Sequence, residues 1–487
     1  MTWISLIVLG LILVFIVRQS AARVSQTPWW LLWLVLMLPA FFIGGWLLLL
    51  GNTPVPSGWL IFVFVTSSVL YLVLLRRGQP PLPAAPPTAP PLTPPLTENG
   101  KLLSQDEETQ LQSCFPWGMY YLQQIEYRPQ AVICRGQMRG DASQVYETVE
   151  RNIAQRFGDR FLVMFQVGLS NKPFFALIPR DRLPQPQQLF RPALSLGLLA
   201  FTFLTTTVAG LALAAPDLTA KELRLNPSLL WQGLPYSVSL LLILGIHELG
   251  HFATAWYYGV KATLPYFIPL PFAMGTLGAF IQMRSPVPHR RALFDISIAG
   301  PIAGLLVTLP ILVWGLQQSE VVQLPANAAE QALNPQVFSP RISILFALIA
   351  KAIFGAALKD DSALHLHPMA VAGVLGLVVT ALNLMPVGQL DGGHIVHAMY
   401  GHRLGAIIGQ VSRLLVLILS FTQPWLFVWA LILFFMPAFD EPALNDVSEL
   451  DNWRDALGLM ALVLLLLIVF PVPAPLAALL LPTYPMP

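Results

Sequence analysis

Long runs of apolar residues recur along the chain between shorter polar segments, and each run predicts a helix within a membrane. A helix needs about 20 apolar residues to cross the hydrocarbon core of a bilayer. The runs that reach or approach this length are residues 1–17, 29–51, 59–75, 192–216, 236–258, 296–316, 368–386, 404–420, 424–437 and 456–471. Run 341–356 is interrupted by Lys351, so we expect a re-entrant or peripheral helix there.

The composition agrees with this pattern. The chain has 487 residues, of which 55% are hydrophobic and only 11% are charged, whereas soluble domains carry about 25% charged residues. The expected fold class is an α-helical polytopic membrane protein, with about 9–11 transmembrane or re-entrant helices and one small α+β soluble domain. A formal net charge of +2, without a basic aromatic patch, indicates no nucleic-acid partner. We expect the lipid bilayer and proteins within it to be the partners.

A small polar domain follows a proline-dense stretch, "QPPLPAAPPTAPPLTPPL", which predicts a stiff, extended spacer. Alternating and amphipathic patterns beyond the spacer predict a ββαββ order of strands and one helix. The expected elements are strands 120–127, 131–138, 160–167 and 173–179, and helix 142–157 with Asp141 as its N-cap. The domain shows no catalytic constellation, so substrate handling, regulation and simple packing all remain open as its role.

These changes in composition predict five segments. They are N-terminal transmembrane segments (1–77), a Pro-rich linker (78–97), a small α+β cytoplasmic domain (98–190), a membrane core that holds the candidate chemistry (191–437), and an acidic loop with a C-terminal transmembrane segment (438–487).

The distribution of Lys and Arg predicts the orientation. Loops 18–28 and 259–291 carry basic residues without acidic ones, whereas loop 317–340 carries only acidic ones. Because basic loops stay in the cytoplasm, both basic loops and the small domain are expected there. Cys114 and Cys134 would then face a reducing compartment and remain free thiols. The first run lacks a basic leader, and no transit peptide is apparent, which favours an uncleaved anchor in a bacterial plasma or thylakoid membrane.

The motif "HELGH" lies in the apolar run 236–258, where ionisable groups are costly and therefore mark candidate functional sites. On a helix, His247 and His251 lie one turn apart on one face and can bind one Zn²⁺, with Glu248 beside them as a general base. The alternative is a purely structural role, as a hydrogen-bonded polar patch at a helix end.

A catalytic zinc site needs a third protein ligand, and two aspartates are candidates. Asp295 follows Arg290 and Arg291 closely, so ion pairing or helix capping already explains it. Asp391 has no such neighbour. The predicted crossings also bring Asp391 to the same depth and side as His247, provided that run 341–356 does not span the membrane. We therefore expect His247, His251 and Asp391 to bind the metal.

Four segments together resemble the site-2 proteases, a family of intramembrane zinc metalloproteases: "HELGH", "GTLGAF", "FDISIAGPIAG" and "NLMPVGQLDGG". The N-terminal spans and the small domain look like the cyanobacterial and chloroplast branch. One departure is that many members carry Asn-Pro-Asp-Gly where this chain has Gln389-Leu390-Asp391-Gly392. The Asp-Gly pair that supplies the ligand is retained.

The resemblance implies one Zn²⁺ per chain and regulated intramembrane proteolysis, the cleavage of substrate proteins within or beside a transmembrane helix. Glu248 would exchange protons with the attacking water and the leaving amine. Asn383 matches a family asparagine and would donate to the substrate carbonyl or oxyanion, although a hydrogen bond between helices is the alternative. The segment 272–283 corresponds to a membrane-embedded hairpin in the family. Its residues Gly275, Thr276, Leu277 and Gly278 would bind substrate as an added strand.

Two other functions remain open from the sequence. A zinc or other divalent-metal transporter also lines its pathway with His and Glu, but it would need ligands at several depths or an internal repeat, and the chain shows neither. A catalytically silent scaffold homologue is disfavoured because all the expected catalytic residues are present.

Overall fold

In a computed structural model, the chain forms two compact units, Met1–Pro95 and Leu96–Pro487. The structure describes residues 27–50, scattered positions between 59 and 74, and residues 103–480 except for 129, 169–171, 183–191, 219, 271–273, 324–336, 360–361, 421–425 and 436–439. Run 1–17, most of run 59–75 and the Pro-rich linker 78–97 lie outside the described residues.

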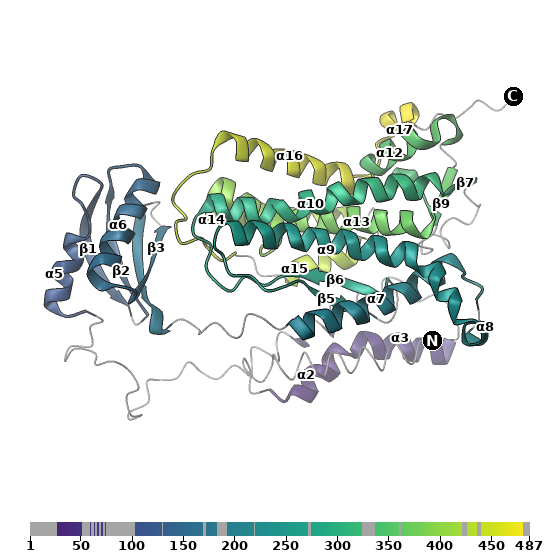
Figure 1. Cartoon of the computed structure of the whole chain (residues 1–487), viewed down its shortest axis with the longest axis horizontal. Coiled ribbons are helices and arrows are strands. Elements are labelled where there is room, and N and C mark those ends of the chain that lie inside the picture. The colour runs from purple at the N-terminus through teal and green to yellow at the C-terminus, as the bar shows by residue number, and fades with distance from the viewer. Residues whose placement is uncertain are drawn as a thin grey trace. The chain divides into compact units, whose positions relative to one another are not determined.

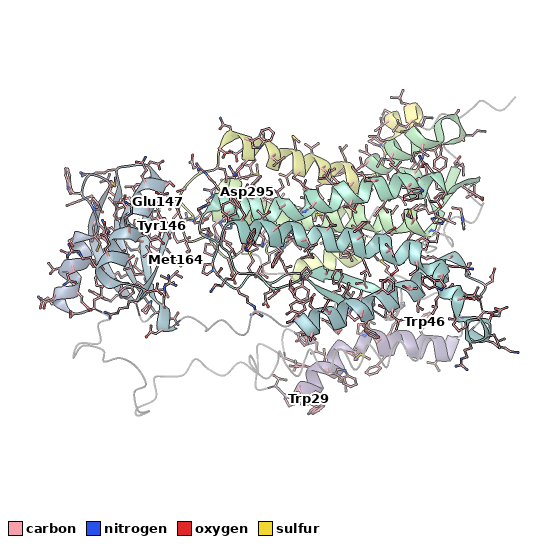
Figure 2. All side chains as sticks on the ribbon, viewed as in Figure 1. Trp29, Trp46, Tyr146, Glu147, Met164 and Asp295 are labelled. Carbon is pink, nitrogen blue, oxygen red and sulfur yellow. The ribbon has the colours of Figure 1, made fainter. Side chains whose placement is uncertain are left out.

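In the first unit, the predicted run 29–51 forms two helices, α2 (Trp29–Leu36) and α3 (Leu38–Leu50). Their axes differ by 48° at the junction, so the pair is either a broken span or a re-entrant loop. Both helices are apolar on all faces, with Trp29 near one end and Trp46 near the other (Figure 2). Helices that are apolar all round are typical of membrane segments.

The small domain has the predicted ββαββ order, and its helix lies in the predicted place. The strands are β1 (Tyr120–Arg128), β2 (Ala131–Met138), β3 (Phe161–Val167) and β4 (Pro173–Pro179), and the helix is α6 (Ala142–Phe157). The sheet is antiparallel in the order β1-β2-β4-β3. Asp141 caps α6 by accepting hydrogen bonds from the backbone amides of Ser143 and Gln144, as predicted.

One helix of this domain, α5 (Gln105–Ser113), was not predicted. Its N-terminus carries a capping box, in which Ser104 accepts from the Glu107 amide and the Glu107 carboxylate accepts from the Ser104 amide. The sequence pattern Ser-x-x-Glu is a known start signal for helices, so residues 104–107 carried the information. Both cysteines of the domain are free and buried, as expected.

The membrane core is helical, and α9, α10, α13 and α14 lie side by side in it (Figure 1). Its helices are α7 (Pro192–Ala214), α8 (Ala220–Leu225), the 3-10 segment η2 (Pro227–Gly233), α9 (Leu234–Tyr257), α10 (Arg290–Gln317), α12 (Ile344–Phe354), α13 (Pro368–Leu384), α14 (Asp391–Ser420), α15 (Leu426–Phe435), α16 (Asn452–Val469) and α17 (Ala474–Leu480).

Among the described residues, five helices are long and apolar enough to cross a membrane, or six if the bent pair α2–α3 forms one span. They are α7, η2 with α9, α10, α14 and α16. The chain is thus mostly helical with several potential spans and a small sheet region, and the predicted total of 9–11 helices remains a prediction. Helix α12 has only 11 residues, about half the length that a span needs, as expected for run 341–356.

Helix α14 begins much earlier than the predicted run 404–420. It starts at Asp391 and is kinked at Gly401, whose φ of 82° lies in the left-handed region that favours glycine. The predicted run begins only at residue 404, so the helical part Asp391–Tyr400 was not predicted. Through this early start, Asp391 is held in the first turn of a helix.

Two short sheets complete the core. One is the hairpin of β5 (Tyr266–Pro269) and β6 (Thr276–Phe280). Of its two strands, β6 lies within the segment 272–283 for which the family resemblance implied a hairpin, whereas β5 lies before that segment. A three-stranded sheet in the order β7-β9-β8 was not predicted. Its strands are β7 (Glu320–Gln323), β8 (Val337–Phe338) and β9 (Ser362–His365), which are too short to leave a clear alternating pattern.

Buried apolar side chains from several helices fill the centre of the core. They include Leu240 and Leu244 of α9, Leu312 of α10, and Val374 and Leu377 of α13. Because α9 packs against both α10 and α13, the face of α9 that carries the HELGH motif is turned into the protein.

Candidate metal centre

Helix α9 presents the three ionisable residues of the HELGH motif to the interior. His247, Glu248 and His251 are only 2%, 7% and 6% exposed. The two imidazoles are one helical turn apart, and their Nε2 atoms lie 3.2 Å from each other. Their spacing therefore places two metal-ligating atoms at one point, as the sequence predicted.

Asp391 joins the two histidines from the start of α14. Its Oδ2 atom lies 3.2 Å from Nε2 of His251 and 3.6 Å from Nε2 of His247. Among the described residues, these three side chains form the single group of His, Cys, Asp or Glu side chains with ligand atoms close enough to share a metal ion. The topological argument that selected Asp391 is consistent with this arrangement.

The donor set fits zinc. In tetrahedral sites, zinc lies about 2.0–2.2 Å from nitrogen and oxygen ligands, so two ligand atoms are separated by roughly 3.3 Å. The three separations here, 3.2, 3.2 and 3.6 Å, bracket that value. Two imidazoles and one carboxylate also match the ligand set of catalytic zinc sites, which leave a fourth position for water or substrate. His247, His251 and Asp391 can thus hold one Zn²⁺.

The competing candidate, Asp295, lies in α10 and is engaged elsewhere (labelled in Figure 2). Its carboxylate accepts two hydrogen bonds from the guanidinium of Arg454, at 2.7 and 2.6 Å, and a third from the hydroxyl of Tyr258 at 2.5 Å. Burial and this carboxylate raise the pKa of Tyr258 to about 12. Asp295 therefore joins α10 to α16. Ion pairing explains it, as expected, but its partner is Arg454 and not the neighbouring Arg290 or Arg291.

Helix α10 orients His251. The Nδ1 atom of His251 lies 2.7 Å from the carbonyl oxygen of Ile296, so Nδ1 carries the proton and Nε2 keeps its lone pair for a metal. Such a hydrogen bond fixes the tautomer and the ring orientation of metal-binding histidines. The Ile296 carbonyl left no signal in the sequence, because every residue has a carbonyl group.

Close packing of α10 on α9 depends on glycine. Gly300 lies against the ring of His251, and a Cβ atom there would overlap Nε2. Gly304, one turn later, lies beside His247, where a Cβ atom would be 3.0 Å from Nδ1. The "AGPIAG" segment that carried part of the family resemblance thus forms the wall behind both imidazoles.

Asn383 lies near the end of α13, with its amide Nδ2 atom 2.9 Å from Nε2 of His247. The side chain therefore forms a hydrogen bond between α13 and α9, the alternative considered for it, and it does so at an atom of the metal-binding group. His394 and His397 do not join this group. Both contact Asp440 instead.

The β5–β6 hairpin is anchored beside the centre by side chains of α7 and α9. Thr205 donates to the Gly275 carbonyl at 2.7 Å, and Tyr236 donates to the Met274 carbonyl at 2.8 Å. Of the four residues predicted to bind substrate, Thr276 is buried and Leu277 is 67% exposed, while Gly275 and Gly278 have positive φ values. The hairpin thus exposes several apolar side chains, namely Leu277 and also Met274 and Phe280, which are 50% and 44% exposed.

Comparison with known proteins agrees with this geometry. Residues 235–422 match the model of peptidase family M50, and residues 109–186 match the model of the EGY3 middle domain. The segment 235–422 is thus similar to peptidase family M50. The resemblance to the site-2 proteases, including their chloroplast branch, is thereby confirmed.

The curated relatives are plant proteins. "Probable zinc metalloprotease EGY2, chloroplastic" of Oryza sativa subsp. indica is 27% identical over 74% of this chain and 65% of its own length. The EGY2 protein of Arabidopsis thaliana is 29% identical over 74% of this chain and 63% of its own length. The Arabidopsis EGY1 protein is 29% identical over 70% and 66%, respectively. The chain thus spans slightly less than two thirds of the first two relatives.

No solved structure matches the chain. The relatives named here are chloroplast proteins, so the expected bacterial membrane remains a prediction. Several long apolar helices and the M50 family together fit a membrane protein.

Proposed function

We propose that the chain is an intramembrane zinc metalloendopeptidase that cleaves substrate proteins within or next to a transmembrane helix. One observation carries the proposal. Two histidines and an aspartate converge within 3.6 Å of one another, directly beside a buried glutamate, among helices long enough to span a bilayer. The similar plant proteins are also named probable zinc metalloproteases. A transporter or a silent scaffold has no such support.

The residues divide the chemical work among themselves. A zinc ion held by His247, His251 and Asp391 supplies Lewis acidity, which polarises the scissile carbonyl and makes water more acidic. Glu248 accepts a proton from the attacking water as its oxygen bonds to the carbonyl carbon. Glu248 then delivers that proton to the amine as the C–N bond breaks. Asn383 donates a hydrogen bond to the carbonyl oxygen, which gains negative charge.

Burial suits Glu248 to this role. Its side chain lies in a region with little water and next to both imidazoles. In such surroundings, a carboxylate and its partners interact more strongly than in bulk water, because the local dielectric constant is low. A single proton can therefore move between water, Glu248 and the leaving amine without exchange with solvent.

The substrate is a transmembrane protein whose helix opens locally at the cleavage site. Peptide bonds in an intact helix are shielded by their own hydrogen bonds, so the opened segment needs new partners. The β6 strand and residues Gly275, Thr276, Leu277 and Gly278 at its start provide an edge to which an extended segment can add.

The proposal keeps the predicted arrangement in the membrane. It places the small domain (98–190) in the cytoplasm and assigns catalysis to residues 191–437, between the segments 1–77 with linker 78–97 and the tail 438–487. Positive loops 18–28 and 259–291 support the orientation. We propose more specifically that the chain is a polytopic protein of a bacterial plasma or thylakoid membrane.

The experiment that tests the function compares wild-type protein with Glu248→Gln in liposomes that contain a candidate transmembrane substrate. Glutamine keeps the size of the side chain and removes its basicity, so cleavage should fall by roughly 10²–10⁴-fold. Zinc content should stay the same, because Glu248 is not a ligand. Asn383→Ala should also retain zinc and lower kcat. Equal cleavage by wild type and Glu248→Gln would refute the proposed mechanism.

A further inference from the structure

The loop between α15 and α16 contacts both the small domain and the segment just before α10. On one side, the backbone of Leu444–Asp446 pairs with the edge strand β3 of the small domain. The Phe165 amide donates to the Leu444 carbonyl at 2.6 Å, and the Asp446 amide donates to the Phe165 carbonyl at 2.9 Å. On the other side, the Leu444 amide donates to the Val287 carbonyl at 2.9 Å, just before α10 begins.

We call residues Ala443–Val447 the bridging segment. Its side chains also belong to the small domain, because Leu444 and Val447 pack against the hydrophobic core of that domain. The side-chain amide of Gln166 donates to the Ala443 carbonyl at 2.7 Å. The bridging segment thus extends the sheet of the small domain by a parallel stretch at its β3 edge.

The loop that carries the bridging segment is fixed to α14 by a buried histidine. Nδ1 of His397 lies 2.9 Å from a carboxylate oxygen of Asp440, and Nε2 lies 2.9 Å from a carboxylate oxygen of Asp446. His397 and Asp446 are only 2% and 5% exposed. Because both ring nitrogens face carboxylates, which only accept hydrogen bonds, His397 is an imidazolium between two negative charges.

Asp440 also contacts two other histidines of α14, His394 and His402. Nδ1 of His394 lies 2.6 Å from its carboxylate, and Nε2 of His402 lies 3.2 Å from its carbonyl oxygen. Burial alone would raise the pKa of Asp440, but the imidazoles of His394 and His397 outweigh burial and lower that pKa to about 2. Asp440 thus contacts both parts of α14, before and after the kink at Gly401.

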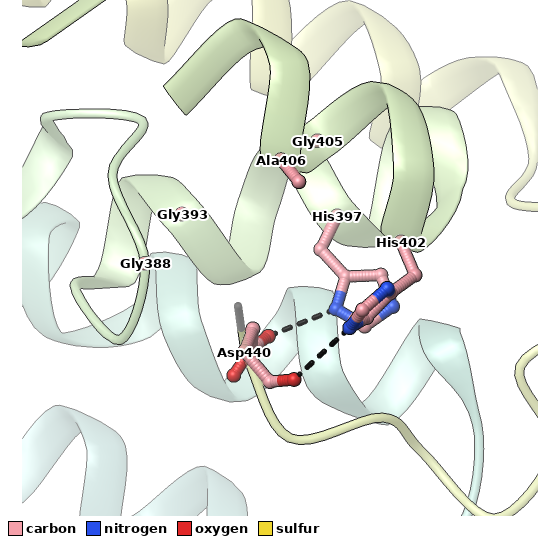
Figure 3. A pocket seen from close by; sticks show the side chains of 7 residues that line it. All are labelled: Gly388, Gly393, His397, His402, Gly405, Ala406 and Asp440. Atoms are coloured by element: carbon pink, nitrogen blue, oxygen red, sulfur yellow. Dashed lines mark hydrogen bonds and ion pairs between the residues drawn. The ribbon is translucent and has the colours of Figure 1, made fainter. Parts of the chain in front are cut away.

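This network lies against the start of α14, where Asp391 is located. Figure 3 shows His397, His402 and Asp440 around a cavity of about 10 Å³, whose wall includes Gly388 and Gly393. Gly388 precedes Asp391 in the loop after α13, and Gly393 follows it in the first turn of α14. The cavity has room for about one water molecule, so the network is a structural joint and not a pocket for a ligand.

Two more contacts reinforce the joint. Arg290, the first residue of α10, donates through Nε to the carbonyl oxygen of Ala398 at 2.7 Å. Arg403 of α14 donates to the carbonyl oxygen of Gly168, at the end of β3, at 2.7 Å. The core thus holds α14 at Ala398, before the kink at Gly401, and the small domain holds it at Arg403, after the kink.

The geometry points to a positioning role for His397. We infer that His397 and the bridging segment couple the small domain to Asp391, so that docking of the small domain sets the position of the third metal ligand. The inference rests on the proposed function for its catalytic consequence, but the coupling itself concerns metal binding. His394 and His397 lie three and six residues after Asp391 on one rigid stretch of helix, so a displacement at His397 also displaces the Asp391 carboxylate.

The first test uses wild-type protein, because coupling between two sites must be reciprocal. Backbone hydrogen exchange is measured with zinc bound and after removal of zinc by a chelator. We expect exchange in β3 and in the bridging segment to rise several-fold when zinc is removed, while exchange in β9, remote from the joint, stays the same. Unchanged exchange in both β3 and the bridging segment would overturn the inference.

The second test measures the dissociation constant for zinc and the visible spectrum of the cobalt-substituted protein. It compares His397→Gln, Val447→Asp and the double variant that combines them. His397→Gln and Val447→Asp should each weaken zinc binding about 10-fold, as loss of an orienting partner typically does, and should shift the cobalt spectrum. Their combined effect should be smaller than the sum of the two, because both break the same linkage. Glu441→Gln is the matched control, since Glu441 is an exposed carboxylate next to Asp440.

A control for general destabilisation completes the design. Leu364→Ala removes a fully buried side chain in β9 and should lower thermal stability without changing zinc affinity. If Leu364→Ala weakens zinc binding as much as His397→Gln at an equal loss of Tm, the positioning role is wrong. Neither readout requires proteolysis. A wild-type protein that binds zinc but cleaves nothing would therefore count against the proposed function alone.

Discussion

The backbone of Gly300 lies directly against the imidazole of His251, with no room for even one methyl group between α10 and the ring. At Gly300→Ala, the new Cβ atom would overlap Nε2, the atom that would bind the metal. Because the same ring is tied through Nδ1 to Ile296 of α10, it cannot turn away without losing that hydrogen bond. Helix α10 therefore controls the position of a ligand that α9 supplies.

We expect Gly300→Ala to weaken zinc binding by roughly 10–100-fold, the range found when groups that orient a ligand are lost. The measurement is a competition titration with a chelating dye. Gly197→Ala in α7 is the control, because nothing lies within 4 Å of a Cβ atom there and alanine favours helices. Wild-type affinity in Gly300→Ala would show that α10 does not constrain His251.

The choice of third ligand leads to a direct comparison of two aspartates. Asp391→Ala removes a carboxylate 3.2 Å from His251, so the purified protein should hold well below one zinc ion per chain. Asp295→Ala should retain zinc but unfold at a lower temperature, because Arg454 loses both of its hydrogen bonds to Asp295. Metal analysis and thermal unfolding separate the two effects. Full zinc content in Asp391→Ala, with a loss in Asp295→Ala, would reverse the assignment.

The orientation of the chain can be tested with single cysteines. Cys114 and Cys134 are nearly inaccessible, with 1% and 0% exposure, and burial raises the pKa of Cys134 to about 12. Both native thiols should therefore react slowly and provide a silent background. Gln112→Cys in α5 and Gln318→Cys after α10 occupy exposed positions on elements that the proposal assigns to opposite sides.

In intact bacterial cells, a membrane-impermeant thiol reagent should label Gln318→Cys at once. It should label Gln112→Cys only after the cells are permeabilised. The reverse pattern would invert the orientation and move the small domain out of the cytoplasm. Labelling of both positions without permeabilisation would mean that the two elements share one side, which contradicts α10 as a membrane span.

The site residues could be predicted from the sequence for different reasons. Local helical spacing was sufficient to predict the arrangement of His247, Glu248 and His251, because residues one turn apart lie on the same face of any helix. Asp391 followed from counting membrane crossings, so it depended on the interpretation of run 341–356, which Lys351 interrupts, as a re-entrant or peripheral helix. Charge is scarce in the apolar segments, and this scarcity left few competing candidates.

The joint around His397 could not be predicted in the same way. Its partners Asp440 and Asp446 come from a loop, and the course of a loop is set by distant contacts, here with β3 and Val287. The two aspartates looked like ordinary solvated charges in an acidic segment. Helix α5, by contrast, was overlooked although its Ser104–Glu107 capping box is visible in the sequence. Local signals were sufficient wherever an element is held by its own residues.

The proposed substrate edge leads to a prediction about Leu277. This side chain is 67% exposed beside α9, at the irregularity where β6 begins. If an extended substrate adds to β6, it covers Leu277, and burial of part of a leucine contributes about 1–2 kcal/mol to binding. Leu277→Ala should therefore raise KM by roughly 5–30-fold. Because the reacting groups are unchanged, kcat and zinc content should stay close to wild type.

Leu249→Ala is the matched control, since Leu249 is 46% exposed and adjoins Glu248 in sequence, but it does not line the hairpin. The assay follows cleavage of one transmembrane substrate in liposomes over a range of substrate-to-lipid ratios. Equal KM values for Leu277→Ala and Leu249→Ala would exclude β6 as the docking edge, whereas a fall in kcat alone would place Leu277 in the support of the metal centre.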